Sequence, residues 1–229
     1  MLLRQLLDKE SCTLTYVLAE DYQSPAVIID PVLEQLELYH RLLREWKLEL
    51  IYCIDTHTHA DHITASGKLA KHYGAKIVVG EQSPALCANV RVKNGNTLFI
   101  GNIPLHVLYT PGHTDDCYCY AADGLVFTGD TLFIRGTGRT DFQSGSAAAA
   151  YRSITQKLFT LPDETIVYPG HDYKGMMLST IGEEKRFNPR LQVNSLEEYV
   201  NIMDRLNLSY PAKMDIALPA NIQCGLTES

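Results

Sequence analysis

Apolar residues recur along the chain with two different spacings, one typical of strands and one typical of helices. The order of these patterns predicts a mixture of strands and helices. Runs rich in β-branched and apolar residues predict strands, while apolar residues at helical spacing predict helices. The predicted strands cover residues 13–18, 26–30, 49–55, 75–79, 97–109, 117–127 and 165–168, with turns at 94–95, 101–102 and 123–124, and the predicted helices cover 33–48, 63–73, 147–159 and 195–206. This order predicts sheets that are covered by helices on their outer faces, followed by an irregular tail after residue 206.

The length of the chain favours one domain. Its 229 residues, 45% of them hydrophobic, are enough to bury a full core, and no linker, repeat or low-complexity segment divides them. We therefore expect a single domain over residues 1–229.

Charge and apolar patterning disfavour several classes of partner. The formal net charge is −7, so nucleic acid and anionic membranes would be repelled by the average surface field. No apolar run reaches the roughly 18 residues of a membrane-spanning helix, and the first ten residues lack the apolar segment of a secretory signal. The expectation is a cytoplasmic protein without a nucleic-acid or membrane partner.

The six cysteines are scattered, without the C-x-x-C spacing of a zinc knuckle or a redox motif. In a reducing cytosol, most of them are expected to be free thiols. Cys224 has no adjacent cation in sequence that would stabilise a thiolate, so its simplest interpretation is a buried thiol.

Histidines gather in the loops that directly follow predicted strands. Three of them share one six-residue segment with a carboxylate, in the pattern H-x-H-x-D-H. The residues concerned are His57, His59, Asp61 and His62, then His113, Asp130 and His171. So many buried polar groups would be costly without a cation, so the cluster predicts a metal centre. The other three histidines, His40, His72 and His106, lie on helix or strand patterns without such neighbours.

The order of these motifs resembles the metallo-β-lactamase superfamily, from about Thr13 to His171. The H-x-H-x-D-H segment is followed by Gly112-His113-Thr114, then by Thr128-Gly129-Asp130, and then by Pro169-Gly170-His171. The resemblance implies an α/β (α+β) fold, an αββα sandwich of two mixed β-sheets flanked by helices.

Later segments resemble one branch of that superfamily, the persulfide dioxygenases, which are also called sulfur dioxygenases or ETHE1-like proteins. These segments are residues 134–143, 168–173, 188–191 and 219–225. Thiolesterases of the glyoxalase II kind usually lack the run from Thr140 to Gln143 and carry a longer helical C-terminal domain. Only 58 residues follow His171, and we expect residues 172–229 to be a family-specific extension of the single domain.

The resemblance implies one iron(II) ion per chain, bound at the catalytic centre by His57, His113 and Asp130. Two imidazoles and one carboxylate leave three positions open on an octahedral ion. Four further residues would orient the ligands and hold waters: His59, Asp61, His62 and His171. An alternative stays open, because Asp61, His62 and His171 with a bridging Asp130 could complete a dinuclear site that activates hydroxide for hydrolysis.

The resemblance also implies the substrates, glutathione persulfide and O2, which react with water to give sulfite and glutathione in sulfide metabolism. Glutathione carries carboxylates, so Arg190 is expected to pair with one and Tyr173 to donate its hydroxyl. Arg139 and Asp141 are expected to form a structural ion pair. A homodimer is expected from the resemblance alone. The competing functions are a hydroxyacylglutathione hydrolase and a non-catalytic relative, and the presence of every ligand-type residue argues against the second.

Overall fold

Six strands form the first sheet, in the spatial order β1-β2-β3-β4-β5-β6. The pairs from β1 to β3 are antiparallel and those from β3 to β6 are parallel, so the sheet is mixed. Helices α1 and α2 make two of the crossovers that parallel neighbours require. The bounds are β1 (Leu2–Leu7), β2 (Leu14–Ala19), β3 (Pro25–Ile29), α1 (Leu36–Trp46), β4 (Glu49–Ile54), α2 (Ser66–Tyr73), β5 (Lys76–Gly80) and β6 (Val90–Val92).

The second sheet also has six strands, in the order β12-β11-β10-β9-β8-β7. β7 to β10 form an antiparallel meander, and β11 joins β10 in parallel after a crossover through α3. The bounds are β7 (Thr97–Ile100), β8 (Ile103–Tyr109), β9 (Tyr118–Ala122), β10 (Leu125–Gly129), α3 (Ala147–Gln156), β11 (Ile166–Pro169) and β12 (Ser179–Thr180).

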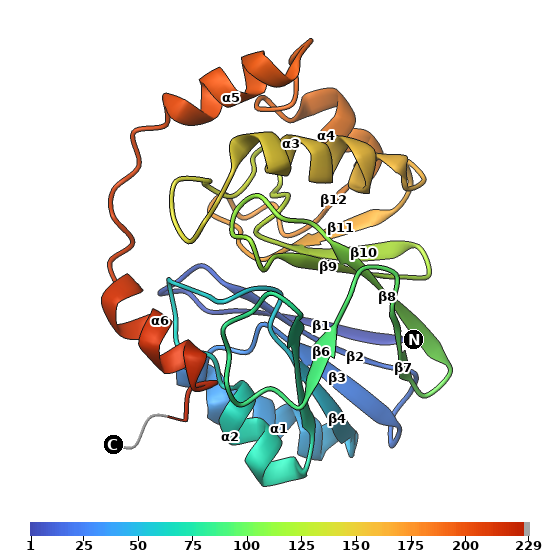
Figure 1. The fold of residues 1–229 in the computed structure, drawn as a ribbon. Coiled ribbons are helices and arrows are strands. Elements are labelled where there is room, and N and C mark those ends of the chain that lie inside the picture. Colours follow the sequence, from blue (N-terminus) through green and yellow to red (C-terminus); the bar gives the residue numbers. More distant parts are fainter. Residues whose placement is uncertain (227–229) are drawn as a thin grey trace.

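The two sheets lie face to face with helices outside both, in a computed structural model that describes residues 1–226 (Figure 1). α1 and α2 cover the first sheet, and the second is covered by α3, α4 (Ile181–Phe187) and α5 (Leu196–Asp204). This confirms the predicted αββα sandwich. In the described part of the chain, no helix has both the length and the apolar composition that a bilayer crossing requires.

Apolar side chains fill three layers of this sandwich. The layer between the sheets contains large aromatic residues such as Tyr16, Tyr118, Tyr120 and Phe127, each at most 1% exposed. Burial of such a side chain stabilises the fold by about 1.5–3 kcal/mol. The two outer layers lie between each sheet and its helices. Alternate residues of a strand therefore pack into the inner layer and into an outer layer. A shift of strand pairing by one residue would exchange these two sets, so the pattern fixes the register of the strands.

The strands that precede the histidine loops end at one edge of the sandwich. β8 and β10 are both antiparallel to β9, and β11 is parallel to β10, so these three strands point the same way. Their following loops begin at Thr110, Asp130 and Gly170. The loop after β4, residues 55–64, meets them across the two sheets; we call it the metal loop.

Several elements were not predicted. β1 lacks a clean alternation of apolar and polar residues, and β6, β12 and α4 are short. The tail after residue 206 contains a helix, α6 (Met214–Ile222), so the prediction of an irregular tail is wrong there. This helix contains Pro219 and has no apolar stripe along one face. Both features argue against a helix in sequence, so the helix was not predicted.

Four cysteines are free thiols, as predicted for most of the six: Cys12, Cys53, Cys117 and Cys119. The prediction of a thiol at Cys224 is wrong, because Cys224 forms a disulfide with Cys87. Its burial was predicted correctly, with 1% of the residue exposed. The two cysteines lie 137 residues apart, and spacing along the sequence gives no sign of such a pair.

Candidate metal centre

His57, His113 and Asp130 come together at the edge where the two sheets meet. His57 lies in the metal loop, His113 follows β8, and Asp130 follows β10. One ligand-type atom from each of the three lies within 4.8 Å of the others. We call these residues the triad. Gly129, at φ +47, brings this strand end within reach of Thr56, where a Cβ would lie 2.5 Å from the Thr56 hydroxyl oxygen.

Hydrogen bonds fix the tautomer of both histidines in the triad. His113 Nδ1 donates to the carbonyl oxygen of Arg139 at 2.7 Å, because a carbonyl can only accept. Thr56 donates its hydroxyl proton to Asp30 at 2.9 Å, so the same oxygen accepts from His57 Nδ1 at 3.0 Å. Both rings therefore keep a free lone pair on Nε2, the form in which imidazole binds a metal.

Electrostatics keep His57 in that neutral form. Burial lowers the pKa of His57 well below its ordinary range, and the neighbouring His59 and His113 lower it further. The two carboxylate oxygens of Asp130 lie near different histidines. Asp130 Oδ2 lies 3.5 Å from His113 Nε2, and Asp130 Oδ1 lies 3.5 Å from His171 Nε2.

A second group, His59, Asp61 and His62, lies beside the triad, and its ligand-type atoms are also within 4.8 Å of one another. We call it the adjacent cluster. His59 Nε2 donates to Asp30 Oδ1 at 3.0 Å. Burial favours the neutral ring of His59, but the charge and hydrogen bond of Asp30 outweigh it and raise the pKa of His59 to about 10.

Asp61 accepts hydrogen bonds from several sides. Its Oδ2 lies 2.9 Å from His62 Nδ1, 3.1 Å from the Thr13 hydroxyl and 3.5 Å from His171 Nε2. Burial would raise the pKa of Asp61, but His62 and His171 hold it well below its ordinary range. Asp61 therefore remains a carboxylate that orients these two rings.

Unpartnered polar atoms show that the residues fit a metal ion. Within residues 1–226, buried side-chain atoms without a hydrogen-bond partner include Asp130 Oδ1 and His62 Nε2. Leaving such atoms unpaired costs free energy, and a cation coordinated by nitrogen and oxygen would remove that cost. All seven residues that were predicted to bind the metal or surround its ligands lie in this one constellation.

Three further residues that position the site were not predicted. Asp30, at φ +51 after β3, accepts from the Thr56 amide at 2.7 Å as well as from His59. Asp116 accepts from the amide and hydroxyl of Thr58 at 3.0 and 2.5 Å. Asn221 binds the metal loop from the C-terminal side. The sequence contained one signal for Asp30, a carboxylate directly after an apolar strand. The contacts of Asp30, Asp116 and Asn221 join distant parts of the chain, which local patterns do not reveal.

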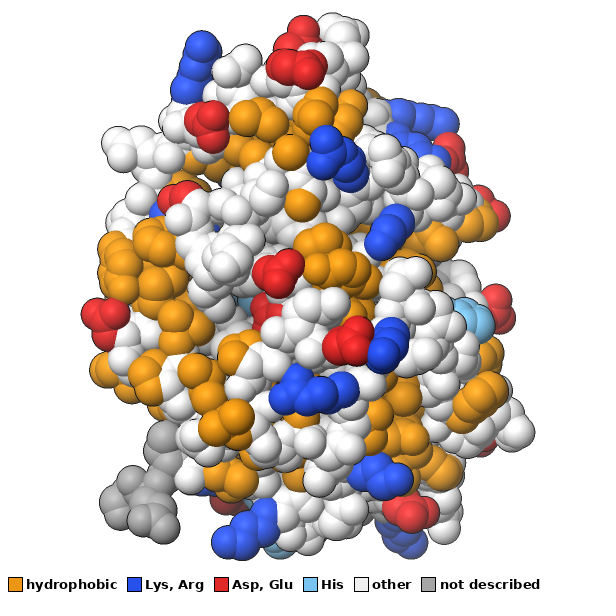
Figure 2. Space-filling model, in the orientation of Figure 1, with side chains coloured by type: hydrophobic (Ala, Val, Ile, Leu, Met, Phe, Trp, Pro, Cys, Tyr) orange, Lys and Arg blue, Asp and Glu red, His pale blue; other side chains and the backbone are white. Residues whose placement is uncertain are grey.

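A cavity of about 590 Å³ opens beside the triad. Its wall includes His113, Asp130 and His171 together with both predicted substrate contacts, Tyr173 and Arg190. Tyr173 stacks on His171, with ring centroids 5.5 Å apart and an angle of 11° between the planes. The connection from α5 to α6 covers this side of the molecule, and hydrophobic side chains gather there and over α6 in Figure 2.

Three arginines line the cavity, and they differ in their partners. Arg139 binds Asp141 through two hydrogen bonds, at 2.7 and 2.8 Å, so the predicted ion pair is formed. Arg135 pairs with Glu183 and Glu184. Arg190 instead donates to the carbonyl oxygen and the hydroxyl of Thr137. Its charge is therefore the one not engaged by a carboxylate in this group.

Comparisons with known proteins agree with this fold. The family model of the Metallo-beta-lactamase superfamily matches residues 88–171. Persulfide dioxygenase ETHE1, mitochondrial, from Bos taurus and from Homo sapiens is 44% identical over 99% of this chain and 89% of the relative. The crystal structure of ETHE1 from Myxococcus xanthus has 51% identity and a TM-score of 0.96, and it covers 98% of this chain and 100% of that one.

The mammalian relatives are named mitochondrial, and this finding overturns the cytoplasmic prediction. That prediction depended on the lack of a secretory signal and of an apolar span in the sequence. Neither feature distinguishes the cytosol from the inside of a mitochondrion, since both compartments hold proteins without them.

Similarity over nearly the whole chain includes the segments that separate the dioxygenase branch from thiolesterases. The identity of 44% extends beyond His171, into the residues that form the cavity wall with Tyr173 and Arg190. The hydrolase interpretation is therefore the weaker of the two. This chain belongs to the persulfide dioxygenase family within the metallo-β-lactamase superfamily.

Proposed function

We propose that this chain is a persulfide dioxygenase with one non-haem iron(II) ion held by His57, His113 and Asp130. The observation that carries the proposal is the triad, in which two imidazoles with free Nε2 lone pairs and one carboxylate converge within 4.8 Å. Two histidines and one carboxylate on one face of an octahedron are the typical ligand set of oxygen-activating iron. Iron bound there would supply the electrons that activate dioxygen.

The proposed reaction converts glutathione persulfide, O2 and water into glutathione, sulfite and two protons. Relatives that share 44% of their residues with this chain are named persulfide dioxygenases, which supports this substrate class. The contribution of the protein is to hold the persulfide in one orientation beside the triad. Fixed orientation makes the encounter effectively unimolecular and lowers its entropic cost.

Arg190 and Tyr173 are the proposed substrate contacts. A glutathione carboxylate matches the planar guanidinium of Arg190, whose partners in the cavity wall are neutral oxygens of Thr137. The hydroxyl of Tyr173 would donate to the peptide part of the substrate. The cavity volume of about 590 Å³ is sufficient for a tripeptide-sized ligand.

The remaining histidines and Asp61 are proposed to orient the site without binding iron. His59 is held by Asp30, and His62 by Asp61. His171 packs between Phe133, in an edge contact at 5.8 Å, and Tyr173. Side chains fixed on several sides keep the geometry of the neighbouring ligands constant.

We further propose that residues 1–229 act as one domain, in which residues 172–229 form the substrate side of the site. The cavity wall takes Arg190 and residues 208–212 from this extension. A homodimer is also proposed, from family membership. Light scattering of the purified chain at several concentrations would give the mass of about two chains.

The function is tested by oxygen uptake of the iron-loaded chain after addition of glutathione persulfide, with sulfite measured in the same sample. We expect uptake and sulfite in equal amounts. Hydrolysis of S-lactoylglutathione without oxygen uptake would assign the chain to the thiolesterases instead.

The substrate contact is tested by Arg190→Lys. Loss of the planar pair should lower kcat/KM for glutathione persulfide by about tenfold through KM, the scale of one charged hydrogen bond. A small alkyl persulfide without carboxylates should react equally with both proteins. The exposed Arg186→Lys is the matched control, and an unchanged KM in Arg190→Lys would contradict the assignment.

A further inference from the structure

The last turn of α6 and the segment that follows it fit closely against the metal loop. Asn221 accepts from the Thr64 amide at 2.9 Å and donates to the carbonyl oxygens of His59 and His62, both at 2.8 Å. A Cβ at Gly225 would lie 2.0 Å from the Thr64 carbonyl oxygen, so there is no space between the two segments. The backbone that carries two site histidines is thus fixed by the C-terminal segment.

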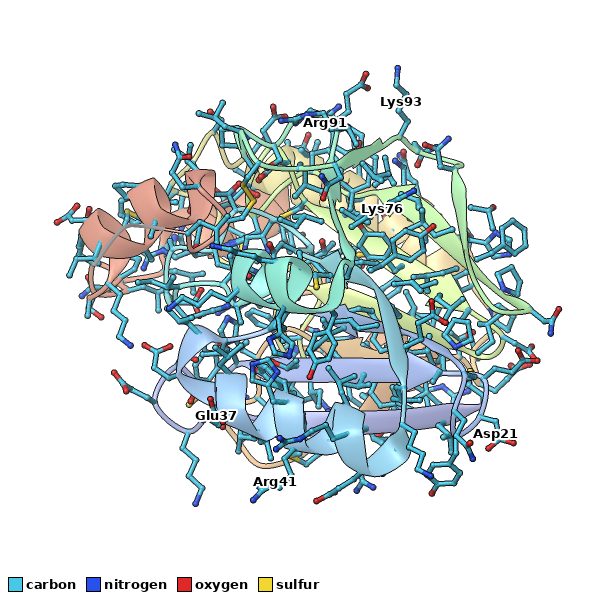
Figure 3. All side chains as sticks on the ribbon, turned by 90° about the horizontal axis from the view of Figure 1, so that it is seen from below. Asp21, Glu37, Arg41, Lys76, Arg91 and Lys93 are labelled. Atoms are coloured by element: carbon cyan, nitrogen blue, oxygen red, sulfur yellow. A yellow bond between two sulfur atoms is a disulfide. The ribbon has the colours of Figure 1, made fainter. Side chains whose placement is uncertain are left out.

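The Cys87–Cys224 disulfide joins this segment to the loop between β5 and β6, residues 81–89 (Figure 3). The Cα atoms of the two cysteines lie 6.2 Å apart. One backbone hydrogen bond supports the same contact, from the Leu86 amide to the Ile222 carbonyl oxygen at 2.9 Å. Cys224 also accepts from the Gly67 amide through its carbonyl oxygen, at 2.9 Å.

The two sides of the disulfide are connected to the first sheet in different ways. Arg91, labelled in Figure 3, donates to the carbonyl oxygens of Ser83 and Ala85, and Asn89 accepts from the Ile77 amide at 2.9 Å. The loop of Cys87 is therefore anchored to the first sheet. The connection that leads into α6, residues 205–213, has no regular structure (Figure 1). The disulfide therefore attaches the C-terminal end of α6 to a loop that is anchored to the first sheet.

We propose that Cys87–Cys224 is a thiol–disulfide exchange site, at which low-molecular-weight thiols control how firmly the metal loop holds its ion. Cys87 is partly exposed, whereas Cys224 is 1% exposed, so an incoming thiolate reaches the Cys87 sulfur. This attack forms a mixed disulfide at Cys87 and breaks the bond to Cys224, which leaves as a thiolate and takes up a proton. A second thiolate then displaces Cys87.

The exchange is balanced without any other oxidant or reductant. Two thiols and the protein disulfide give one small disulfide and two protein thiols, and the reverse reaction uses the same small disulfide. Reduction breaks the covalent link between the end of α6 and residues 81–89. The hydrogen bonds from Asn221 to the metal loop are then weakened. The effect on the ion rests on the proposed metal centre, whereas the exchange itself does not.

The test uses the iron-loaded chain, kept free of oxygen and equilibrated with mixtures of glutathione and glutathione disulfide. After removal of the small molecules, the state of Cys87 is read by alkylation and mass spectrometry, and iron loss is followed with a chromogenic chelator. We expect the reduced chain to lose iron about tenfold faster, the scale for removing a group that orients a ligand. Equal rates in the two states, or no disulfide at any mixture, would overturn the proposal.

Two variants separate the exchange from other effects. Cys87→Ser should lose iron at the fast rate in every mixture, while Cys12→Ser, the partly exposed free cysteine, should keep the difference between states. Asn221→Ala should be fast in both states, because the contact that transmits the effect is gone. A Cys87→Ser chain that still responds to glutathione would contradict the mechanism. The two states could differ in the rate of iron loss while the chain shows no persulfide-dependent oxygen uptake. That result would contradict the proposed function but not the exchange site.

Discussion

The triad and the adjacent cluster contain the same kinds of side chain, but they differ in how many of their ring nitrogens keep a free lone pair. In the triad, His57 and His113 each donate through Nδ1 to a protein oxygen, so Nε2 stays free. In the adjacent cluster, His62 has the same arrangement, with Nδ1 on Asp61 and Nε2 without a partner in residues 1–226. His59 is instead paired with the buried carboxylate of Asp30, which favours its protonated ring, and Asp61 accepts from His62 and Thr13.

This difference shows that residue type alone does not identify metal ligands. Both groups place three ligand-type atoms within 4.8 Å. What separates them is the set of hydrogen-bond partners: both rings of the triad keep Nε2 for a cation, whereas in the adjacent cluster His62 keeps Nε2 and His59 is held protonated by Asp30. The following predictions separate the two groups by removing one partner at a time, from the largest expected effect to the smallest.

Replacing Asp130 by Ala should remove iron and activity together. The variant loses the only carboxylate of the triad, so oxygen uptake should fall by more than about 1000-fold, as for a catalytic unit that fails as a whole. Iron content and oxygen uptake are measured on the same sample. Asp123→Ala, in the exposed turn of the β9–β10 hairpin, is the control and should resemble the native chain. An iron-replete, active Asp130→Ala chain would show that the ligand assignment is wrong.

Replacing Asp30 by Asn should weaken iron binding by about 10- to 100-fold while the triad stays intact. Asp30 orders Thr56, which in turn fixes the tautomer of His57. Competition with a chelator of known affinity gives the change in dissociation constant. The exposed Asp21→Asn serves as the control, and an unaltered affinity in Asp30→Asn would mean that this carboxylate has no part in positioning the triad.

His171→Ala should keep its iron but lose about tenfold in activity. His171 lies 3.5 Å from both Asp61 and Asp130 and orients them, which is the role of a group outside the ligand set. Iron content separates this outcome from that of Asp130→Ala. Loss of one of two bound ions would instead favour a dinuclear centre.

The pH dependence of stability should reveal the His59–Asp30 pair in the metal-free chain. Asp30 raises the pKa of His59 from 6.5 to about 10 in the folded state, despite the opposing effect of burial. The stabilisation by protonated His59 is therefore complete below pH 6.5 and is lost as the pH rises to about 10. Urea unfolding across this range should show a steeper fall in unfolding free energy for the native chain than for Asp30→Asn. Identical slopes would contradict the pairing.

Most of the fold could be predicted because its periods are local. The strands around Val27 and Phe127 and the helix around Leu42 carry patterns that fit two apolar layers. α6 was not predicted because it contains Pro219 and its apolar residues form no stripe along one face. This helix packs only in the complete fold. Its position depends on contacts with the metal loop, which no local pattern contains.

The site was predictable to the extent that its residues are adjacent in sequence or follow strands. The segment from His57 to His62 concentrates three imidazoles in one loop, and that density alone points to a metal. The roles of Asp30 and Asn221, and the Cys87–Cys224 pair, depend on residues brought together from distant parts of the chain. A resemblance to a family supplied the ligand set, and the hydrogen bonds supply a physical reason for it.

Metal stoichiometry of the native chain and of His62→Ala, measured by elemental analysis on the same preparation, tests the central claim most directly. His62 belongs to the adjacent cluster and has a buried Nε2 without a partner among the described residues, so it is the most sensitive position for a second ion. We predict one iron per chain in both proteins. Two metal ions in the native chain and one in His62→Ala would contradict a mononuclear centre at the triad.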